Sequence, residues 1–191
     1  MAKRILVLLG HPSGGSYCAA IAETYAAEAQ KAGHSVRILK VGELPIDLVP
    51  PSYKADTELA GWVKAVQEEI AWSNHWVIVA PMWWGGTPAV LKSLFDRVLL
   101  PGFAFKYIKG PIPDKLLTGR SATFLMTSDT PSFWFDFILR RPLFNQMKRQ
   151  VLELCGFKPI RQIMFSPILH STQAQREKWL KRVAAMGAGG L

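Results

Sequence analysis

The chain has 191 residues, 49% of them hydrophobic, and a net charge of +9. This length suits one domain over residues 1–191 that needs no disulfide or metal to stabilise its core. No apolar run reaches the ~18 residues of a membrane span, the start is unlike a signal peptide, and Cys18 and Cys155 follow no metal-binding pattern. These features argue against stable membrane insertion and predict a cytoplasmic protein with free thiols.

The positive charge is unevenly distributed. Residues 1–105 contain 9 Lys+Arg and 9 Asp+Glu, whereas residues 106–191 contain 14 and 5. A basic half can attract anionic ligands or nucleic acid, and a solvated basic face is an equally good interpretation.

Strand and helix patterns alternate along the chain. Apolar runs typical of buried parallel strands predict strands at 4–9 and 75–80, and further strands are predicted at 35–40, 121–127 and 161–165. Periodicity, caps and stops predict helices at 16–32, 56–73, 87–100, 142–154 and 173–186, the third opened by Thr87 as N-cap and Pro88 at its first position. Residues 102–119 and 128–141 are long connections, and residues 187–191 are expected to fray. Five strands alternating with five helices predict an α/β fold, a doubly wound five-stranded parallel sheet with helices on both faces.

In such a sheet, ligands bind beyond the carboxyl ends of the strands, where the strand order reverses. The loops after the first, third and fourth strands should therefore carry the function. In this sequence they are also the loops with the most unusual composition.

The first of these loops, residues 10–17 (GHPSGGSY), joins a strand to a helix. Its backbone N–H groups and the helix dipole suit a phosphate. It lacks the lysine of a Walker A loop, because Ser16 stands there, and His11-Pro12 break the dinucleotide-binding G-x-G-x-x-G pattern. What remains is a phosphate site without lysine, as a mononucleotide such as FMN would use, or an ordinary turn capped by serine.

The other two loops are aromatic. Residues 81–88 contain Trp83 and Trp84, which could stack on a flat ring ligand or could belong to the core or a subunit interface. Residues 127–135 begin with hydroxyl groups and Asp129 and continue with aromatic residues, which fits either a ligand contact or a capped turn followed by a packed flap.

Two segments carry a family resemblance: RILVLLGHPSGGSYCAAIAETYAAEAQKAGHSVRILKV, which begins at Arg4, and PMWWGGTPAVLKSLFDRVLLPGFAF, residues 81–105. They resemble the flavodoxin-like NAD(P)H:quinone oxidoreductases, in order along nearly the whole chain. The resemblance implies a flavodoxin-like fold and cofactor contacts from three groups of residues: His11, Ser16, Tyr17 and Cys18 on the phosphate and ribityl chain; Pro81, Met82, Trp83, Trp84 and Gly85 on the flavin ring; and Met126, Thr127, Ser128 and Asp129 at its other edge. It also implies substrate contacts from Phe103, Phe105, Tyr107 and Trp134, the first three across a homodimer interface.

The same resemblance implies an enzyme that reduces a quinone-like acceptor by two electrons. NAD(P)H would pass hydride to the flavin, leave, and be replaced by the acceptor in a ping-pong sequence. Two departures are visible: glycines of the family give way to Ser128-Asp129, and Arg140 or Arg141 stands near a family histidine. The cofactor that the resemblance implies is FMN, with FAD as the alternative, because the matched residues serve the mononucleotide part.

We expect no protein nucleophile, catalytic acid or metal, since the sequence has no Ser-His-Asp or metal-ligand constellation. The alternatives are an electron carrier, a flavin-binding regulatory subunit with slow turnover, and a nucleic-acid-binding module that uses the basic half. The last would bind nucleic acid with steep salt dependence and no flavin, and we do not expect a nucleic-acid partner.

Overall fold

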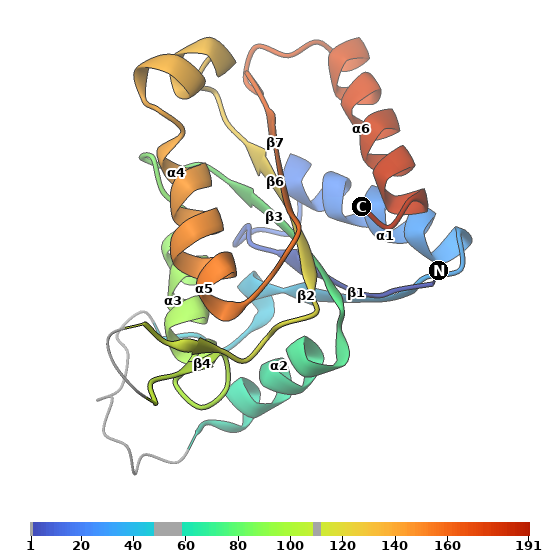
Figure 1. Cartoon of the computed structure of the whole chain (residues 1–191). Coiled ribbons are helices and arrows are strands. Elements are labelled where there is room, and N and C mark those ends of the chain that lie inside the picture. Colours follow the sequence, from blue (N-terminus) through green and yellow to red (C-terminus); the bar gives the residue numbers. More distant parts are fainter. Residues whose placement is uncertain (1, 48–58, 109–111) are drawn as a thin grey trace.

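The computed structural model describes residues 2–47, 59–108 and 112–191. Its centre is a parallel five-stranded sheet in the order β2-β1-β3-β6-β7 (Figure 1). These strands are β1 (Arg4–Leu9), β2 (Ser35–Lys40), β3 (His75–Pro81), β6 (Ser121–Thr127) and β7 (Ile160–Phe165). The order reverses between β1 and β3, which confirms the predicted doubly wound, flavodoxin-like sheet.

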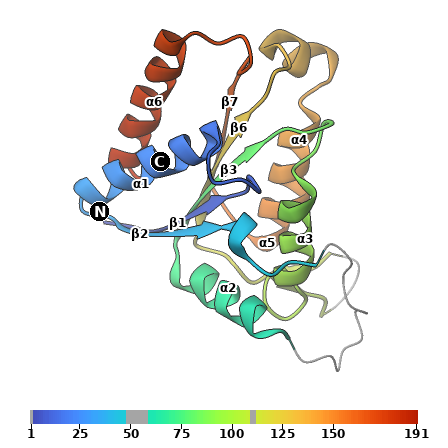
Figure 2. The same ribbon diagram turned by 180° about the vertical axis from the view of Figure 1, so that it is seen from behind.

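Helices cover both faces of the sheet (Figures 1 and 2). One face carries α1 (Tyr17–Lys31) and α6 (Gln173–Ala188). The other carries α2 (Gly61–Trp72), α3 (Ala89–Val98) and a continuous helical run of α4 (Pro142–Asn145), η3 (Gln146–Leu152) and α5 (Glu153–Cys155). The η3 segment is π-helical, which the sequence did not predict. The run ends where predicted, at Gly156 with a φ of 110°.

The sheet separates two hydrophobic cores because successive side chains of a strand point to opposite faces. Along β1, Leu6 and Leu8 pack under α2 and α3. Ile5, Val7 and Leu9 pack under α1 and α6. Both faces of the inner strands are therefore apolar, which is why they appear in the sequence as continuous hydrophobic runs.

The α1–α6 pair packs without a gap along its length. At one end, a Cβ on Gly187 would lie 2.4 Å from the carbonyl oxygen of Tyr25, so only glycine allows this approach. At the other end, the Tyr17 hydroxyl donates to the carbonyl of Arg176 at 2.9 Å. The two helices are thus joined at both ends.

Two predicted helix starts are wrong. Thr87 does not cap α3: the carbonyl of Pro88 accepts the first helical bonds from Leu91 (3.0 Å) and Lys92 (3.1 Å), and Pro88 has an extended ψ of 141°. The helix predicted from residue 56 begins at Gly61, after an extended Ala60; residues 56–58 lie outside the described part.

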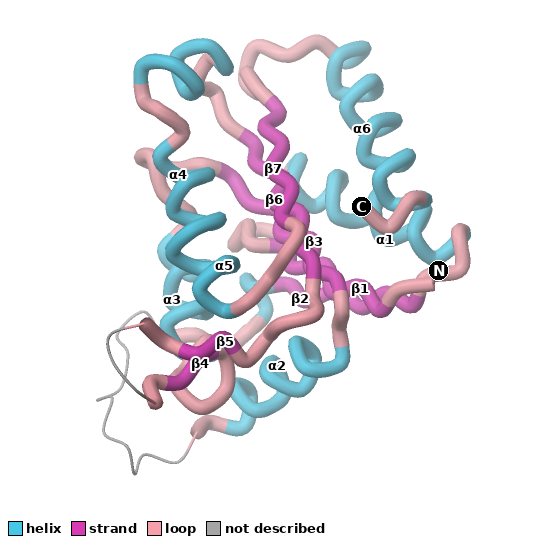
Figure 3. Tube along the Cα trace, viewed as in Figure 1, coloured by secondary structure: helices cyan, strands magenta, loops and turns pink. Residues whose placement is uncertain are grey.

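Two further features differ from the sequence prediction. The connection at 102–119 contains a short antiparallel hairpin of β4 (Phe105–Lys106) and β5 (Asp114–Lys115), which lies beside α5 in Figure 3. Residues 187–191 do not fray: α6 continues to Ala188, and beyond it the Lys3 ammonium donates to the Gly190 carbonyl at 2.6 Å.

Candidate functional site

An open cavity of about 200 Å³ lies at the carboxyl edge of the sheet. The loops after β1, β3 and β6, which the sequence analysis selected, all contribute to it, and so does the loop after β7. Its lining consists of His11, Ser16, Tyr17, Cys18, Pro81, Met82, Trp83, Thr127, Ser128, Asp129 and Ile168.

The loop after β1 forms the start of α1. The Ser16 hydroxyl caps the helix by accepting from the Ala19 N–H at 3.2 Å. The N–H groups of the first two helical residues, Tyr17 and Cys18, precede the first intrahelical bonds, which run from Ala19 and Ala20 to the Ser16 carbonyl. Gly14 and Gly15 are open, because no described atom comes within 4 Å of where their Cβ would be. This end of the cavity can therefore receive an anion.

A glycine after β2 supports this loop from behind. A Cβ on Gly42 would lie 2.1 Å from the Pro12 carbonyl oxygen and 2.8 Å from its carbonyl carbon. Both are backbone atoms, so no side-chain rotation could relieve the contact. Gly42 lets the 3-10 turn η1 (Val41–Glu43) fix the position of Pro12 and of the loop around it.

An imidazole joins the first loop to the second. Nδ1 of His11 lies 3.0 Å from both the N–H and the carbonyl oxygen of Ser13, so the ring is held by the backbone of its own loop. The His11 ring meets the edge of the Trp83 ring at 5.5 Å between centroids. The two ring planes are nearly perpendicular, at 77°, and this edge contact links the two loops at the cavity.

The second loop is a tight hairpin that separates two adjacent tryptophans. Trp83 and Gly86 exchange backbone hydrogen bonds of 2.9 Å, and the two residues between them, Trp84 and Gly85, have φ values of 50° and 77°. This turn holds Trp83 against the cavity with 45% of its surface exposed and turns Trp84 fully into solvent. Of the two tryptophans, only Trp83 is thus placed to contact a ring in this chain's own cavity.

The third loop forms a hydroxyl-bearing floor. The Cys18 sulfur lies 3.2 Å from the Thr127 hydroxyl, and burial raises the pKa of this thiol to about 11, so it stays protonated at neutral pH. Ser128 accepts from the Thr130 N–H at 3.0 Å. Asp129 accepts from the Leu169 N–H at 2.5 Å and so ties this loop to the one after β7.

The loop after β7 was missed by the sequence analysis. It places Ile168 in the cavity wall through a 3.0 Å bond from its N–H to the Ser128 carbonyl. The guanidinium of Arg176 donates to Ser171 Oγ (2.8 Å) and to the Ile168 carbonyl (3.3 Å), which puts a cation beside Tyr17. The only signal in the sequence was position, since this loop also follows a strand at the same edge.

The structure gathers ten of the thirteen predicted cofactor contacts around one cavity. Trp84 and Gly85 form the hairpin tip outside it, and Met126 is fully buried in the core. The predicted substrate contacts do not line the cavity: Phe103, Phe105 and Tyr107 lie at or beside β4, and Trp134 begins the π-helical turn η2 (Trp134–Ile138) at the end of the third loop.

The cavity fits a flavin mononucleotide by its chemistry. It offers backbone donors at a helix N-terminus for a phosphate, hydroxyls for a ribityl chain, and Met82 with Trp83 for a ring. A second, smaller cavity lies between α2, α3 and the sheet, but its lining is purely apolar and cannot orient a nucleotide.

A family profile described as a flavodoxin-like fold matches residues 3–186. The chain belongs to this flavodoxin-like family. One relative is an uncharacterized NAD(P)H oxidoreductase of Haemophilus influenzae, 24% identical over 94% of this chain and 91% of the relative. Another is an FMN-dependent NADH:quinone oxidoreductase of Nitratidesulfovibrio vulgaris, 26% identical over 95% of this chain and 97% of the relative.

The crystal structure of Smu.1420 from Streptococcus mutans matches with a TM-score of 0.87 and 27% identity, over 97% of this chain and 99% of that one. Several mammalian quinone dehydrogenases also match, but there the matched region spans about half of their length. Family members similar to this chain over most of their length thus include named NAD(P)H oxidoreductases.

Proposed function

We propose that this flavodoxin-like protein is an FMN-dependent NAD(P)H oxidoreductase that reduces quinones or similar acceptors. The observation that carries the proposal is a single cavity that combines an anion-receptive helix N-terminus without lysine, a hydroxyl floor and an aromatic wall. FMN rather than FAD is favoured because these features match one phosphate, one ribityl chain and one ring. The named relatives of nearly equal length support the same assignment.

Each loop has a defined task in this proposal. The N–H groups at the start of α1 hold the phosphate, with Ser16 fixing the helix end and Gly42 fixing the loop. Thr127 and Ser128 hydrogen-bond the polar parts of the cofactor, and Trp83 supports the ring. When bound, FMN supplies the hydride chemistry by which NAD(P)H reduces the acceptor. The protein binds and orients the reactants.

Two finer points belong to the proposal. Phe103, Phe105 and Tyr107 lie away from this chain's own cavity, so their predicted substrate contact requires the site of a second copy, and we propose a homodimer. We place the protein in the cytoplasm, in keeping with two buried free cysteines. In the described ranges, no helix has both the length and the apolar character needed to span a membrane.

The test is the visible absorption spectrum of the purified protein, recorded without oxygen before and after addition of NADPH or NADH. We expect flavin bands that bleach on reduction and return when a water-soluble benzoquinone is added. Acid release of the cofactor then distinguishes FMN from FAD.

Two outcomes would contradict the proposal. A colourless protein that takes up neither FMN nor FAD would remove the flavin assignment. Flavin bands that do not bleach with either nicotinamide would keep the cofactor and point to an electron carrier or a regulatory subunit.

A further inference from the structure

A turn at residues 133–141, here named the aromatic turn, presents large apolar side chains to solvent. Phe133 is 63% exposed, Phe137 78% and Ile138 57%, and Trp134 and Leu139 are also exposed. In Figure 1 this segment is the ochre helical turn at the top of the molecule, beyond the carboxyl end of β6. Contiguous exposed apolar side chains mark an interaction surface.

The aromatic turn is held rigidly in this orientation. Phe135 alone points inward, fully buried, with its ring 5.2 Å from that of Phe144. Arg141 donates its N–H to the Phe135 carbonyl (2.9 Å), and Asn145 donates its side-chain amide to the Arg140 carbonyl (2.8 Å). The exposed apolar side chains therefore belong to a turn that is itself hydrogen-bonded and anchored in the core by Phe135.

Two consecutive arginines end the aromatic turn in an unfavourable backbone conformation. Arg140 and Arg141 have φ values of 57° and 56°, in the left-handed region. This conformation costs about 1–2 kcal/mol per residue for a side chain larger than glycine. Strained residues of this kind cluster at functional sites, and here they set two cations next to the exposed aromatic rings.

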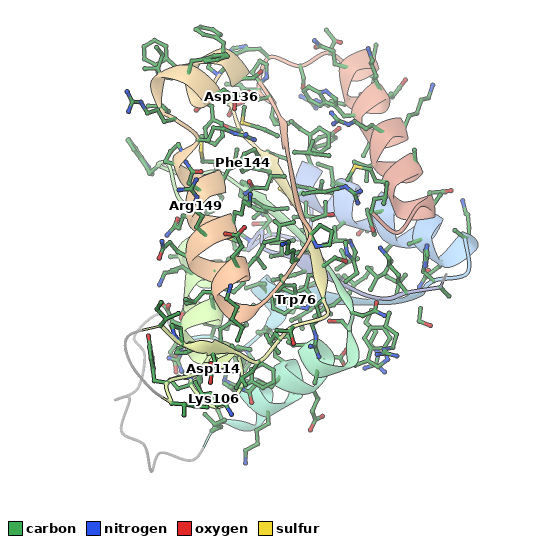
Figure 4. All side chains as sticks on the ribbon, in the orientation of Figure 1. Trp76, Lys106, Asp114, Asp136, Phe144 and Arg149 are labelled. Carbon is green, nitrogen blue, oxygen red and sulfur yellow. The ribbon has the colours of Figure 1, made fainter. Side chains whose placement is uncertain are left out.

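The charges of the aromatic turn are arranged asymmetrically. Asp136, its one acid, is paired with Arg141 at 3.2 Å. Figure 4 shows Asp136 at this end of the molecule with Phe144 just inside it. Arg140 has no acidic partner in the described part of the chain, whereas Lys148, further along in η3, is paired with Glu153 at 3.8 Å. The surface thus combines exposed aromatic and aliphatic side chains with the unpaired positive charge of Arg140.

We propose that the aromatic turn docks on an anionic lipid bilayer and brings the cavity to quinones dissolved in the membrane. The identity of the acceptor rests on the proposed function. Aromatic and aliphatic side chains flanked by arginine bind the headgroup region of anionic bilayers. The turn begins four residues after Asp129, which lines the cavity, so a docked molecule has its site next to the membrane surface.

A second copy of the chain is a poorer occupant for this face. The residues that we assign to the homodimer contact, Phe103, Phe105 and Tyr107, lie at or beside β4, and Figure 4 shows Lys106 of β4 at the opposite end of the molecule from Asp136. A second copy that covered the aromatic turn would have to bury Arg140, and burying an unpaired cation is strongly unfavourable. An anionic bilayer instead attracts this charge.

The test measures co-sedimentation with vesicles of phosphatidylcholine plus phosphatidylglycerol, and with phosphatidylcholine alone. We expect the wild-type protein to bind the anionic vesicles in preference. The double variant F137S/I138S should bind them at least about tenfold more weakly, because two large apolar side chains no longer insert. Arg140→Gln should bind them about fivefold more weakly. Ile112→Ser is the matched control, since it removes an exposed side chain (79%) two residues before Asp114, at the opposite end in Figure 4.

Activity measurements separate this inference from the proposed function. With a long-chain quinone in anionic vesicles, F137S/I138S should turn over more slowly than wild type, and with a soluble benzoquinone at the same rate. Wild type that reduces the soluble quinone but does not sediment with anionic vesicles would overturn the docking inference alone. A double variant that sediments with anionic vesicles like wild type would also overturn it. The same holds if wild type does not bind vesicles and the double variant changes from dimer to monomer in size-exclusion chromatography. Vesicle binding without any quinone reduction would refute the proposed function and leave the docking surface standing.

Discussion

Gly42 offers a test of the phosphate loop that does not touch the cavity. The residue lies behind the loop after β1 and is absent from the cavity lining. Gly42→Ala would place a Cβ 2.1 Å from the Pro12 carbonyl oxygen and 3.1 Å from its Cα. Carbon–oxygen contacts in proteins are rarely below about 3 Å, as weak C–H···O geometry illustrates, so Pro12 must move by roughly 1 Å.

The expected size of the effect follows from this displacement. Moving the loop by roughly 1 Å disturbs the N–H groups that face the phosphate, and each hydrogen bond to a charged group contributes about 1.5–3 kcal/mol. Loss of one such bond weakens FMN binding by about tenfold to a hundredfold. The fold should survive, because η1 and the loop are both at the surface edge of the sheet and can separate.

The assay is a titration of apoprotein with FMN, followed by flavin fluorescence, together with thermal unfolding of the apoprotein. Gly61→Ala is the control: it makes the same change at the first residue of α2, where no described atom lies within 4 Å of the added Cβ, and should leave FMN affinity unchanged. If folded Gly42→Ala protein binds FMN as tightly as wild type, the loop after β1 does not hold the phosphate in the way argued here.

Three further predictions address the ring wall, the pH dependence and the helix pair. Trp83→Ala should weaken FMN binding by about tenfold or more, because the ring contact is lost. Trp84→Ala, at the solvent-facing tip, should change FMN affinity by no more than about twofold. Equal losses of affinity in the two variants would contradict the assignment of the ring contact to Trp83 alone. Burial, followed by nearby positive charges, lowers the pKa of His75 to about 3, so only the unfolded chain takes up this proton as the pH falls from about 6.5 to 3. The contribution of His75 to the free energy of unfolding is thus complete above about pH 6.5 and falls by up to about 1.4 kcal/mol per pH unit below it. In urea unfolding, the free energy of His75→Gln should therefore decrease less steeply with falling pH than that of wild type. An unchanged slope would refute a buried neutral imidazole. Gly187→Ala should lower stability by about 1–3 kcal/mol in thermal unfolding, because its Cβ would lie 2.4 Å from the Tyr25 carbonyl oxygen; an unchanged melting temperature would show that the helices can separate freely.

The inner strands of the sheet were predictable because they are buried on two faces. Residues 5–9 and 76–80 are apolar throughout, and apolar runs this short between turn residues favour strands over helices. The position of the site then followed from topology, since ligands bind at the carboxyl edge where the strand order reverses. Ten of the predicted cofactor contacts lie around the resulting cavity.

The remaining details depend on contacts between distant residues. Sequence cannot distinguish Trp83 from Trp84, because a two-residue turn decides which ring faces the cavity. The hairpin of β4 and β5 consists of two-residue strands that exist only through their mutual pairing. The glycine-rich segment at 187–191 indicated a frayed end, but Gly187 serves close packing against Tyr25, a contact that only the folded pair of helices reveals.

The contacts between α1 and α6 join the helix that begins at the phosphate loop to the last part of the chain to be synthesised. The phosphate loop opens α1, yet the first residue of that helix, Tyr17, is tied to a carbonyl 159 positions later, and the far end of α1 rests on Gly187. A ribosome therefore makes the phosphate-binding segment long before it makes the helix that steadies it. The nascent chain cannot complete the packing of α1 until α6 has emerged and docked, so the helix that begins at the phosphate loop is among the last parts of this fold to be fixed.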